Sequence, residues 1–276
     1  MATVDKLADP WFKPPPRGED LPHDDGEPME TARHRQQMNL LIDTLDDHWR
    51  DRDDVCVEGN MFVYFSELQA KQNDFRGPDV FVVMDTVRRE RKSWVVWEED
   101  GRTPDVVIEL TSPSTEHVDR GDKMRIYAQL LHVPEYYIYD PWTARLDAFE
   151  LDGSTRTYRA RTPDAEGRFA SRVTGLSLGV IPGTFQGVEA PWLRWITPEG
   201  VVVPTGRERA EQEAARADHE AARAAQATAR AEQEAARAEQ EAARAAQEAA
   251  RAAQEAARAE DALRRVVELE AKLAKG

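Results

Sequence analysis

The chain has 276 residues, of which 41% are apolar, and its formal net charge at pH 7 is −15. A single cysteine, Cys56, excludes an internal disulfide and a multi-cysteine zinc site. No apolar run reaches the roughly 20 residues that a membrane helix requires, and nothing at the N-terminus resembles a leader peptide. We therefore expect a soluble, cytoplasmic protein that does not associate with membranes.

The charge and the apolar residues are unevenly distributed along the chain. Residues 207–276 are nearly all Ala, Glu, Gln and Arg, so the globular part must come from about the first 200 residues, which suits one domain. Residues 1–206 hold 24 basic and 37 acidic residues, a net charge of −13. An acidic domain should not bind duplex DNA broadly or tightly, because such affinity comes largely from neutralising phosphates.

Residues 1–22 are rich in proline and charge, and they predict an extended arm that precedes a domain over residues 23–204. The first helix is expected between Thr31 and Arg50, where Met38, Leu41, Ile42, Leu45 and Trp49 fall at helical spacing. Steps of four backwards along this stripe place His34 and Glu30 on the inward side, at the positive end of the helix dipole.

Strands dominate the middle of the chain. β-Branched and aromatic segments bounded by Gly, Pro, Asn and Asp predict strands at Val55–Val57, Met61–Phe65, Asp79–Met84 and Trp94–Trp97. The run Asp105–Leu110 is apolar and continuous apart from Glu109, as expected of a central strand with both faces covered. Leaving a glutamate in such a strand is costly unless the carboxylate has a partner, which favours a functional role.

A second helix is expected after the break at Ser112-Pro113-Ser114. Asp119 is a candidate N-cap, and the inward stripe consists of Ile126, Tyr127 and Leu130. Lys123 precedes Ile126 and Tyr127 by three and four positions, so the aliphatic part of its side chain starts on the buried face. Its ammonium can therefore reach the end of the sheet. A strand at Pro134–Asp140 and a hairpin around Asp152-Gly153 follow, giving an α/β to α+β body.

Asp79, Glu109 and Lys123 together predict a metal-dependent nuclease site on paired strands. Magnesium is held by one or two carboxylates plus waters and substrate phosphates, and a nearby lysine can support the attacking water or the charge on the phosphate. Glu30 is a candidate for a further catalytic carboxylate. Asp105 repeats the Pro-Asp dipeptide, but it lies four residues from Glu109 on one strand, roughly 13 Å away, too far to share an ion.

Several segments of this sequence carry a resemblance to a known family: Asp24–Glu30 with Arg33-His34-Arg35, Gly77-Pro78-Asp79-Val80, Lys92–Glu98, Pro104–Ser114 and Pro134-Glu135-Tyr136. Together they resemble the Uma-two family of putative restriction endonucleases, which is placed in the PD-(D/E)XK nuclease superfamily. The resemblance implies a restriction-endonuclease-like core, with a mixed central sheet flanked by helices. It also implies Asp79 and Glu109 as ligands of Mg²⁺, with Mn²⁺ as a possible substitute, and DNA as the substrate.

The superfamily pattern places a lysine two residues after the second acid, where this chain has Thr111. A lysine that has moved to the following helix, Lys123, would restore the site, and an inactive site would show the same sequence. The dense basic cluster of Arg88, Arg89, Arg91 and Lys92 fits either a grip on the phosphate backbone or a solvated hairpin tip.

The tail, residues 207–276, repeats with a period of seven and predicts a long helix of roughly 100 Å. The core positions of a coiled coil would start at Ala214, Ala217, Ala221 and Ala224. Alanine methyls bury little area, so the drive to pair is weak until Leu263, Val266, Leu269 and Leu273. The tail fits self-association, a spacer or a docking arm. Two functions remain open: a metal-dependent deoxyribonuclease, or a catalytically silent nuclease-like module that acts through its tail.

Overall fold

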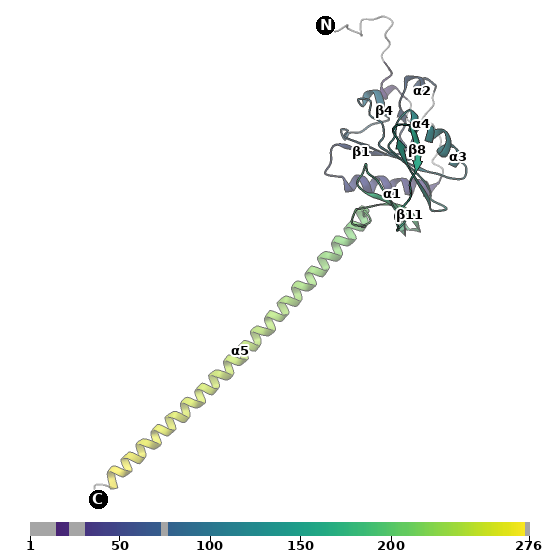
Figure 1. Cartoon of the computed structure of the whole chain (residues 1–276). Helices are drawn as coiled ribbons and strands as arrows, with labels where there is room; N and C mark the ends of the chain where they lie inside the picture. The colour runs from purple at the N-terminus through teal and green to yellow at the C-terminus, as the bar shows by residue number, and fades with distance from the viewer. Residues whose placement is uncertain (1–14, 22–30, 73–76, 274–276) are drawn as a thin grey trace, which may run out of the picture. The chain divides into compact units, whose positions relative to one another are not determined.

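The computed structural model describes residues 15–21, 31–72 and 77–273. Its contacts divide the chain into two compact units, residues 1–209 and residues 210–276. The first unit contains every strand of the described residues, and the second consists of most of one long helix. The α/β class, with a mixed central sheet, flanking helices and a long C-terminal helix, is confirmed (Figure 1).

A mixed six-stranded sheet forms the centre of the first unit. In sheet order its strands are β1 (Val55–Glu58), β3 (Val80–Met84), β5 (Val106–Leu110), β6 (Glu135–Asp140), β7 (Arg145–Asp152) and β8 (Thr157–Ala160). Neighbouring strands are antiparallel except β5 and β6, which are parallel and are joined by a helical crossover. Every residue of β5 is buried, as expected of a central strand covered on both faces.

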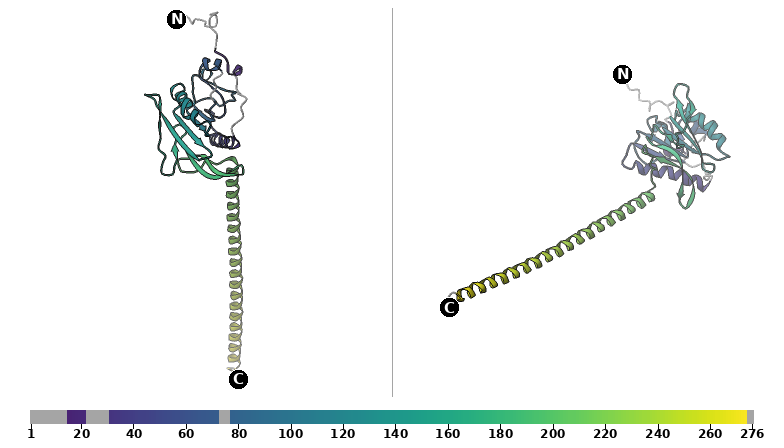
Figure 2. Two further views of the ribbon diagram at one scale, coloured as in Figure 1. Left: turned by 90° about the vertical axis from the view of Figure 1, so that its right-hand side faces the viewer. Right: turned by 60° about the horizontal axis from the view of Figure 1, so that its bottom comes forward.

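One face of this sheet is covered by α1 (Ala32–His48) and by a second, three-stranded sheet. The strands of that sheet are β9 (Phe169–Ala170), β10 (Ser177–Phe185) and β11 (Val188–Ile196). In Figure 2 the purple helix α1 lies beside the green strands β10 and β11. The buried amide of Gln37 exchanges two hydrogen bonds of 2.9 Å with the backbone of Leu193, so it ties the helix to the edge strand.

The opposite face is covered by a short helical segment and by a small parallel pair of strands. The segment consists of α3 (Glu116–Val118), the π-helical turn η4 (Asp119–Lys123) and α4 (Met124–Gln129), and the pair is β2 (Val63–Tyr64) and β4 (Trp94–Val95). α2 (Glu67–Gln72) and η3 (Val96–Glu98) are short connecting helices. Ile126, Tyr127 and Leu131 pack with Phe81, Val107 and Tyr136 in this second core.

Two details of the predicted second helix are wrong. The helical segment begins at Glu116 after Thr115, so Asp119 lies inside it and does not cap it. Leu130 is 52% exposed, whereas Leu131 is buried. Leu130 is exposed because α4 ends at Gln129, so Leu130 is the C-cap residue and the chain turns Leu131 inward instead.

The part of the predicted N-terminal arm that the structure describes, residues 15–21, packs on the domain. Leu21 is buried beside Phe62 and Tyr64, and the indole of Trp97 donates a hydrogen bond of 3.0 Å to the carbonyl of Pro16. This stretch contains a short 3₁₀ turn, Gly18–Asp20. It therefore belongs to the folded unit.

The last element, α5 (Gly206–Leu273), is one unbroken helix of 68 residues. It starts with a capping box, because the Glu208 amide donates to the Thr205 hydroxyl and the Thr205 amide donates to the Glu208 carboxylate. Leu263, Val266, Val267 and Leu269 are exposed near its C-terminal end. Among the described residues, no helix combines the length and the apolar character needed to cross a bilayer.

Candidate active site

Asp79 and Glu109 come together through the register of β3 and β5. Val80 pairs with Ile108 and Phe81 pairs with Val107, so one further step of this antiparallel ladder puts Asp79 opposite Glu109. Oδ2 of Asp79 accepts a hydrogen bond of 2.7 Å from the amide of Leu110. Side chains alternate along a strand, so both carboxylates lie on the face covered by α4.

A close backbone approach fixes the position of Asp79. A Cβ atom built on Gly59 would lie 2.1 Å from the carbonyl oxygen of Asp79, so only glycine fits there. The next residue, Asn60, donates its amide to the carbonyl of Pro78 at 2.9 Å. The Gly59-Asn60 loop therefore holds the start of β3 against β5.

Glu109 is fully buried and has a polar partner on each oxygen. Oε1 accepts a hydrogen bond of 2.7 Å from the hydroxyl of Tyr127, and Oε2 accepts one of 2.9 Å from the ammonium of Lys123. Burial and the charge of Asp79, against the opposing effect of Lys123, raise the pKa of Glu109 to about 8. Burial likewise raises the pKa of Asp79, again opposed by Lys123.

Lys123 reaches the site from η4, on the inward side as the sequence predicts. Its side chain is 23% exposed, and Nζ lies 2.9 Å from Oε2 of Glu109 and 2.9 Å from Oδ1 of Asp119. Burial alone would lower the pKa of Lys123, but the carboxylates of Glu109, Asp119 and Asp79 outweigh it and raise that pKa. Lys123 is therefore a cation among three acids.

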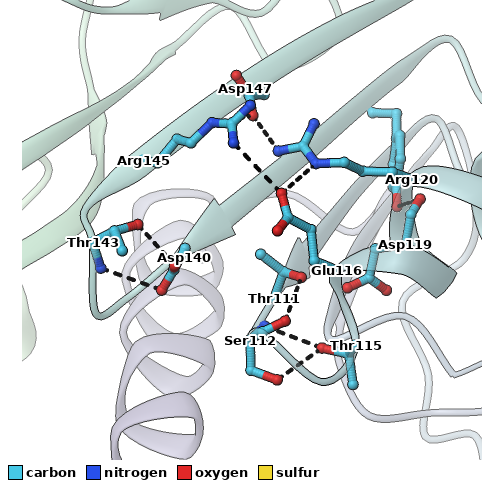
Figure 3. A network of polar contacts seen from close by, with 11 residues as sticks. Thr111, Ser112, Thr115, Glu116, Asp119, Arg120, Asp140, Thr143, Arg145 and Asp147 are labelled. Carbon is cyan, nitrogen blue, oxygen red and sulfur yellow. Dashed lines mark hydrogen bonds and ion pairs between the residues drawn. The ribbon is translucent and has the colours of Figure 1, made fainter.

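The lysine position of the superfamily pattern is filled by a residue of the turn after β5. Thr111 is buried, and its amide donates a hydrogen bond of 2.8 Å to Tyr139. Figure 3 shows the turn from Thr111 to Thr115, in which the Thr115 hydroxyl accepts a hydrogen bond of 3.1 Å from the Ser112 amide. The turn ends in α3, which leads into η4 and so brings Lys123 back to the carboxylates.

Two other candidates from the sequence do not contribute to this arrangement. Asp105 accepts a hydrogen bond of 2.7 Å from the amide of Met84, so it serves the β3–β5 pairing. His34 is buried in the first turn of α1, where its amide donates to the N-cap hydroxyl of Thr31 at 3.2 Å. Glu30 lies outside the described residues.

The basic cluster is largely neutralised within the domain. The Arg91 guanidinium, 3% exposed, binds the Glu99 carboxylate through two hydrogen bonds of 2.7 and 3.0 Å, and Arg89 binds the same carboxylate. Arg88 pairs with Asp46, and Lys92 is exposed. Three of the four cations therefore already have an acidic partner, which favours a structural role for them over a grip on phosphates.

The donor set fits a hard divalent cation. Asp79 and Glu109 supply carboxylate oxygens from adjacent strands, and Asp79 is partly exposed, which gives access from solvent. Among the described residues, no three Asp, Glu, His or Cys side chains gather around one point. Such an ion would therefore take two protein carboxylates and complete its coordination with water or phosphate oxygens.

Asp119 also belongs to the group of charges around Lys123, although the sequence did not predict it as a site residue. It precedes Lys123 by four positions, a spacing that places both side chains on one side of a helix and that was available as a signal. The same aspartate also satisfies the pattern of an N-cap. Only the position of the helix start distinguishes the two roles.

Comparison with known proteins relates the sequence to one family and to two individual proteins. A sequence model of the Uma2 family, described as "Putative restriction endonuclease", matches residues 12–181. An uncharacterized protein of Synechocystis sp., slr1290, is 25% identical over 151 residues, which are 54% of this chain and 73% of that protein. A crystal structure of a putative nuclease of the DUF820 family from Anabaena variabilis superposes with a TM-score of 0.37 at 12% identity, covering 59% of this chain and 80% of that one.

Proposed function

The chain belongs to the Uma2 family of putative restriction endonucleases, and on that basis we propose that it is a metal-dependent endodeoxyribonuclease. Asp79 and Glu109 are the proposed metal ligands, and Lys123 is the proposed catalytic lysine. The preferred ions are Mg²⁺ or Mn²⁺, since both ligands are carboxylates. The substrate class, DNA, follows from the description of the family.

The observation that carries the proposal is the convergence of Asp79, Glu109 and Lys123 from three separate elements. The two acids are opposed across β3 and β5, and the lysine hydrogen-bonds one of them from η4. Keeping a fully buried carboxylate beside a second one costs stability, because burial and the charge of Asp79 both raise the pKa of Glu109. Such unfavourable pairing of titratable groups is typical of functional sites.

The residues divide the chemistry of phosphodiester hydrolysis between them. When bound, a divalent ion would polarise the scissile phosphate and lower the pKa of a water molecule. Lys123 can donate hydrogen bonds to a phosphate oxygen and offset the charge that develops there. Tyr127 holds Glu109 in one orientation through its 2.7 Å hydrogen bond.

The acidic surface limits how the substrate can bind. Residues 1–206 carry a net charge of −13, and the three arginines of the basic cluster, Arg88, Arg89 and Arg91, are paired with acids. We therefore expect weak, strongly salt-dependent binding to DNA by a single copy. Self-association through α5 would place two sites on one substrate, as a double-strand break requires.

One observation favours the second candidate, a silent module that retains the nuclease fold. Thr111 replaces the lysine of the superfamily pattern, and Lys123 is engaged by Glu109 and Asp119. In that case Lys123 and its two carboxylate partners would only stabilise the fold. Metal binding separates the two functions.

The test is cleavage of supercoiled plasmid by the full-length protein at low salt with Mg²⁺ or Mn²⁺. We expect nicking that EDTA abolishes and that Glu109→Gln reduces by at least about 100-fold, whereas Glu189→Gln, an exposed glutamate on β11, leaves it unchanged. Absence of cleavage with either metal, in protein that binds neither, would support the silent module instead.

A further inference from the structure

Lys123 has two carboxylate partners, and it uses them differently. Its Nζ lies 2.9 Å from Oε2 of Glu109 and 2.9 Å from Oδ1 of Asp119. The contact with Glu109 is a hydrogen bond, whereas Oδ1 of Asp119 is buried at ion-pair distance and accepts no hydrogen bond. Asp119 therefore offers the ammonium a second position that is only partly used.

The position of Asp119 is fixed independently of its carboxylate. Its backbone carbonyl accepts a hydrogen bond of 2.9 Å from the hydroxyl of Tyr136, which is fully buried on β6. Asp119 itself is 1% exposed, and it opens the π turn that ends at Lys123. A carboxylate in such a place is costly without a cation, and the cation beside it is Lys123.

We propose that Asp119 is a positioning residue that receives the Lys123 ammonium when a divalent cation binds Glu109. The inference rests on the proposed function, because it concerns the same metal site. A cation at Oε2 of Glu109 must displace the ammonium that now occupies that oxygen. Without Asp119 the displaced charge would remain in a largely buried place with no partner, and metal binding would carry that cost.

The charges of the cluster agree with this exchange. With all groups ionised, Asp79, Glu109, Asp119 and Lys123 have a net charge of −2, which one divalent cation neutralises. Among the described residues, the three acids do not surround a common point, so Asp119 is separated from the proposed ligands by the lysine. Asp119 consequently acts through Lys123 rather than as a third ligand.

The test is a double-mutant cycle on Mn²⁺ affinity, measured by calorimetry on the full-length protein without DNA. Asp119→Asn should weaken Mn²⁺ binding by roughly 10-fold, the usual cost of losing a residue that supports a metal ligand. Lys123→Met removes the ammonium, so in that background Asp119→Asn should change the affinity by no more than about twofold.

Each other outcome has a distinct meaning. Equal losses in both backgrounds would make Asp119 a ligand, and no loss in either would leave it without a role in metal binding; both results overturn the inference. If the unsubstituted chain binds no Mn²⁺, the proposed function itself fails, and this inference fails with it.

A second variant keeps the test decisive if Asp119→Asn does not fold. Tyr136→Phe leaves every charge in place and removes the hydroxyl that holds the Asp119 carbonyl. We expect it to weaken Mn²⁺ binding by about threefold, less than a ligand substitution would. Unchanged affinity in a folded Tyr136→Phe protein would contradict the positioning role.

Discussion

Tyr127 donates a hydrogen bond of 2.7 Å to Oε1 of Glu109, and both side chains are fully buried. The other oxygen of this carboxylate accepts from Lys123, so Glu109 is held from both sides. Any cation that binds there has to compete with a proton and with the ammonium.

Tyr127→Phe should destabilise the protein by about 1–3 kcal/mol, the usual cost of leaving a buried acceptor without its donor. The hydroxyl lowers the pKa of Glu109, so its loss should also move Mn²⁺ binding to higher pH. Chemical denaturation and calorimetry measure the two effects. Tyr158→Phe removes a hydroxyl that donates to the carbonyl of Val133, and as the matched control it should leave the pH dependence of binding unchanged.

The affinity for Mn²⁺ should rise by about tenfold per pH unit up to pH 8 and then level off. A carboxyl with its pKa raised to about 8 is protonated below that pH, and the metal has to displace the proton. Binding constants from pH 6 to pH 9 measure the effect. An affinity that is flat across this range would show that Glu109 is not a ligand.

Without metal, the protein should lose stability as the pH rises from 5 to 8. The pKa of Glu109 is higher in the folded state than its ordinary value of 4.5, so the folded state binds the proton more tightly between these two values. The stability that protonated Glu109 contributes is therefore fully present below about pH 4.5 and is lost as the pH rises past 8. Asp79 shifts in the same direction. Melting temperatures should show a shallower decline in Glu109→Gln, and an unchanged slope would contradict the assignment.

Self-association should depend on the apolar end of α5. Leu263 and Val266 are 68% and 50% exposed and three residues apart, as in a coiled-coil seam, whereas the preceding seam positions are alanines apart from Thr228. We expect the full-length chain to form dimers that Leu263→Glu with Val266→Glu dissociates, and Arg258→Glu, outside the seam, to have no such effect. Sedimentation velocity measures the masses. A chain that is monomeric at tens of micromolar would instead leave α5 as a spacer or docking arm.

Several elements could be predicted because their signals are local. The helical spacing of Leu41 and Leu45 predicts α1, the continuous apolar run before Glu109 predicts β5, and the alanines that recur every seven residues predict α5. The strands β9 to β11 are additions to the predicted elements. β10 contains Pro182 and two glycines and pairs Pro182 with Pro191, so it lacks the regular alternation by which strands are recognised.

The sequence by itself determined which groups have an unusual chemical environment. A glutamate inside an apolar strand and a lysine in phase with a buried stripe can be read from spacing alone, since local periodicity sets the side of an element on which each side chain lies. Only the tertiary structure decided which of these side chains come into contact. The β3–β5 register opposes Asp79 and Glu109, and the packing of η4 on the sheet brings Lys123 to Glu109, because both depend on how separate segments pack rather than on any local pattern.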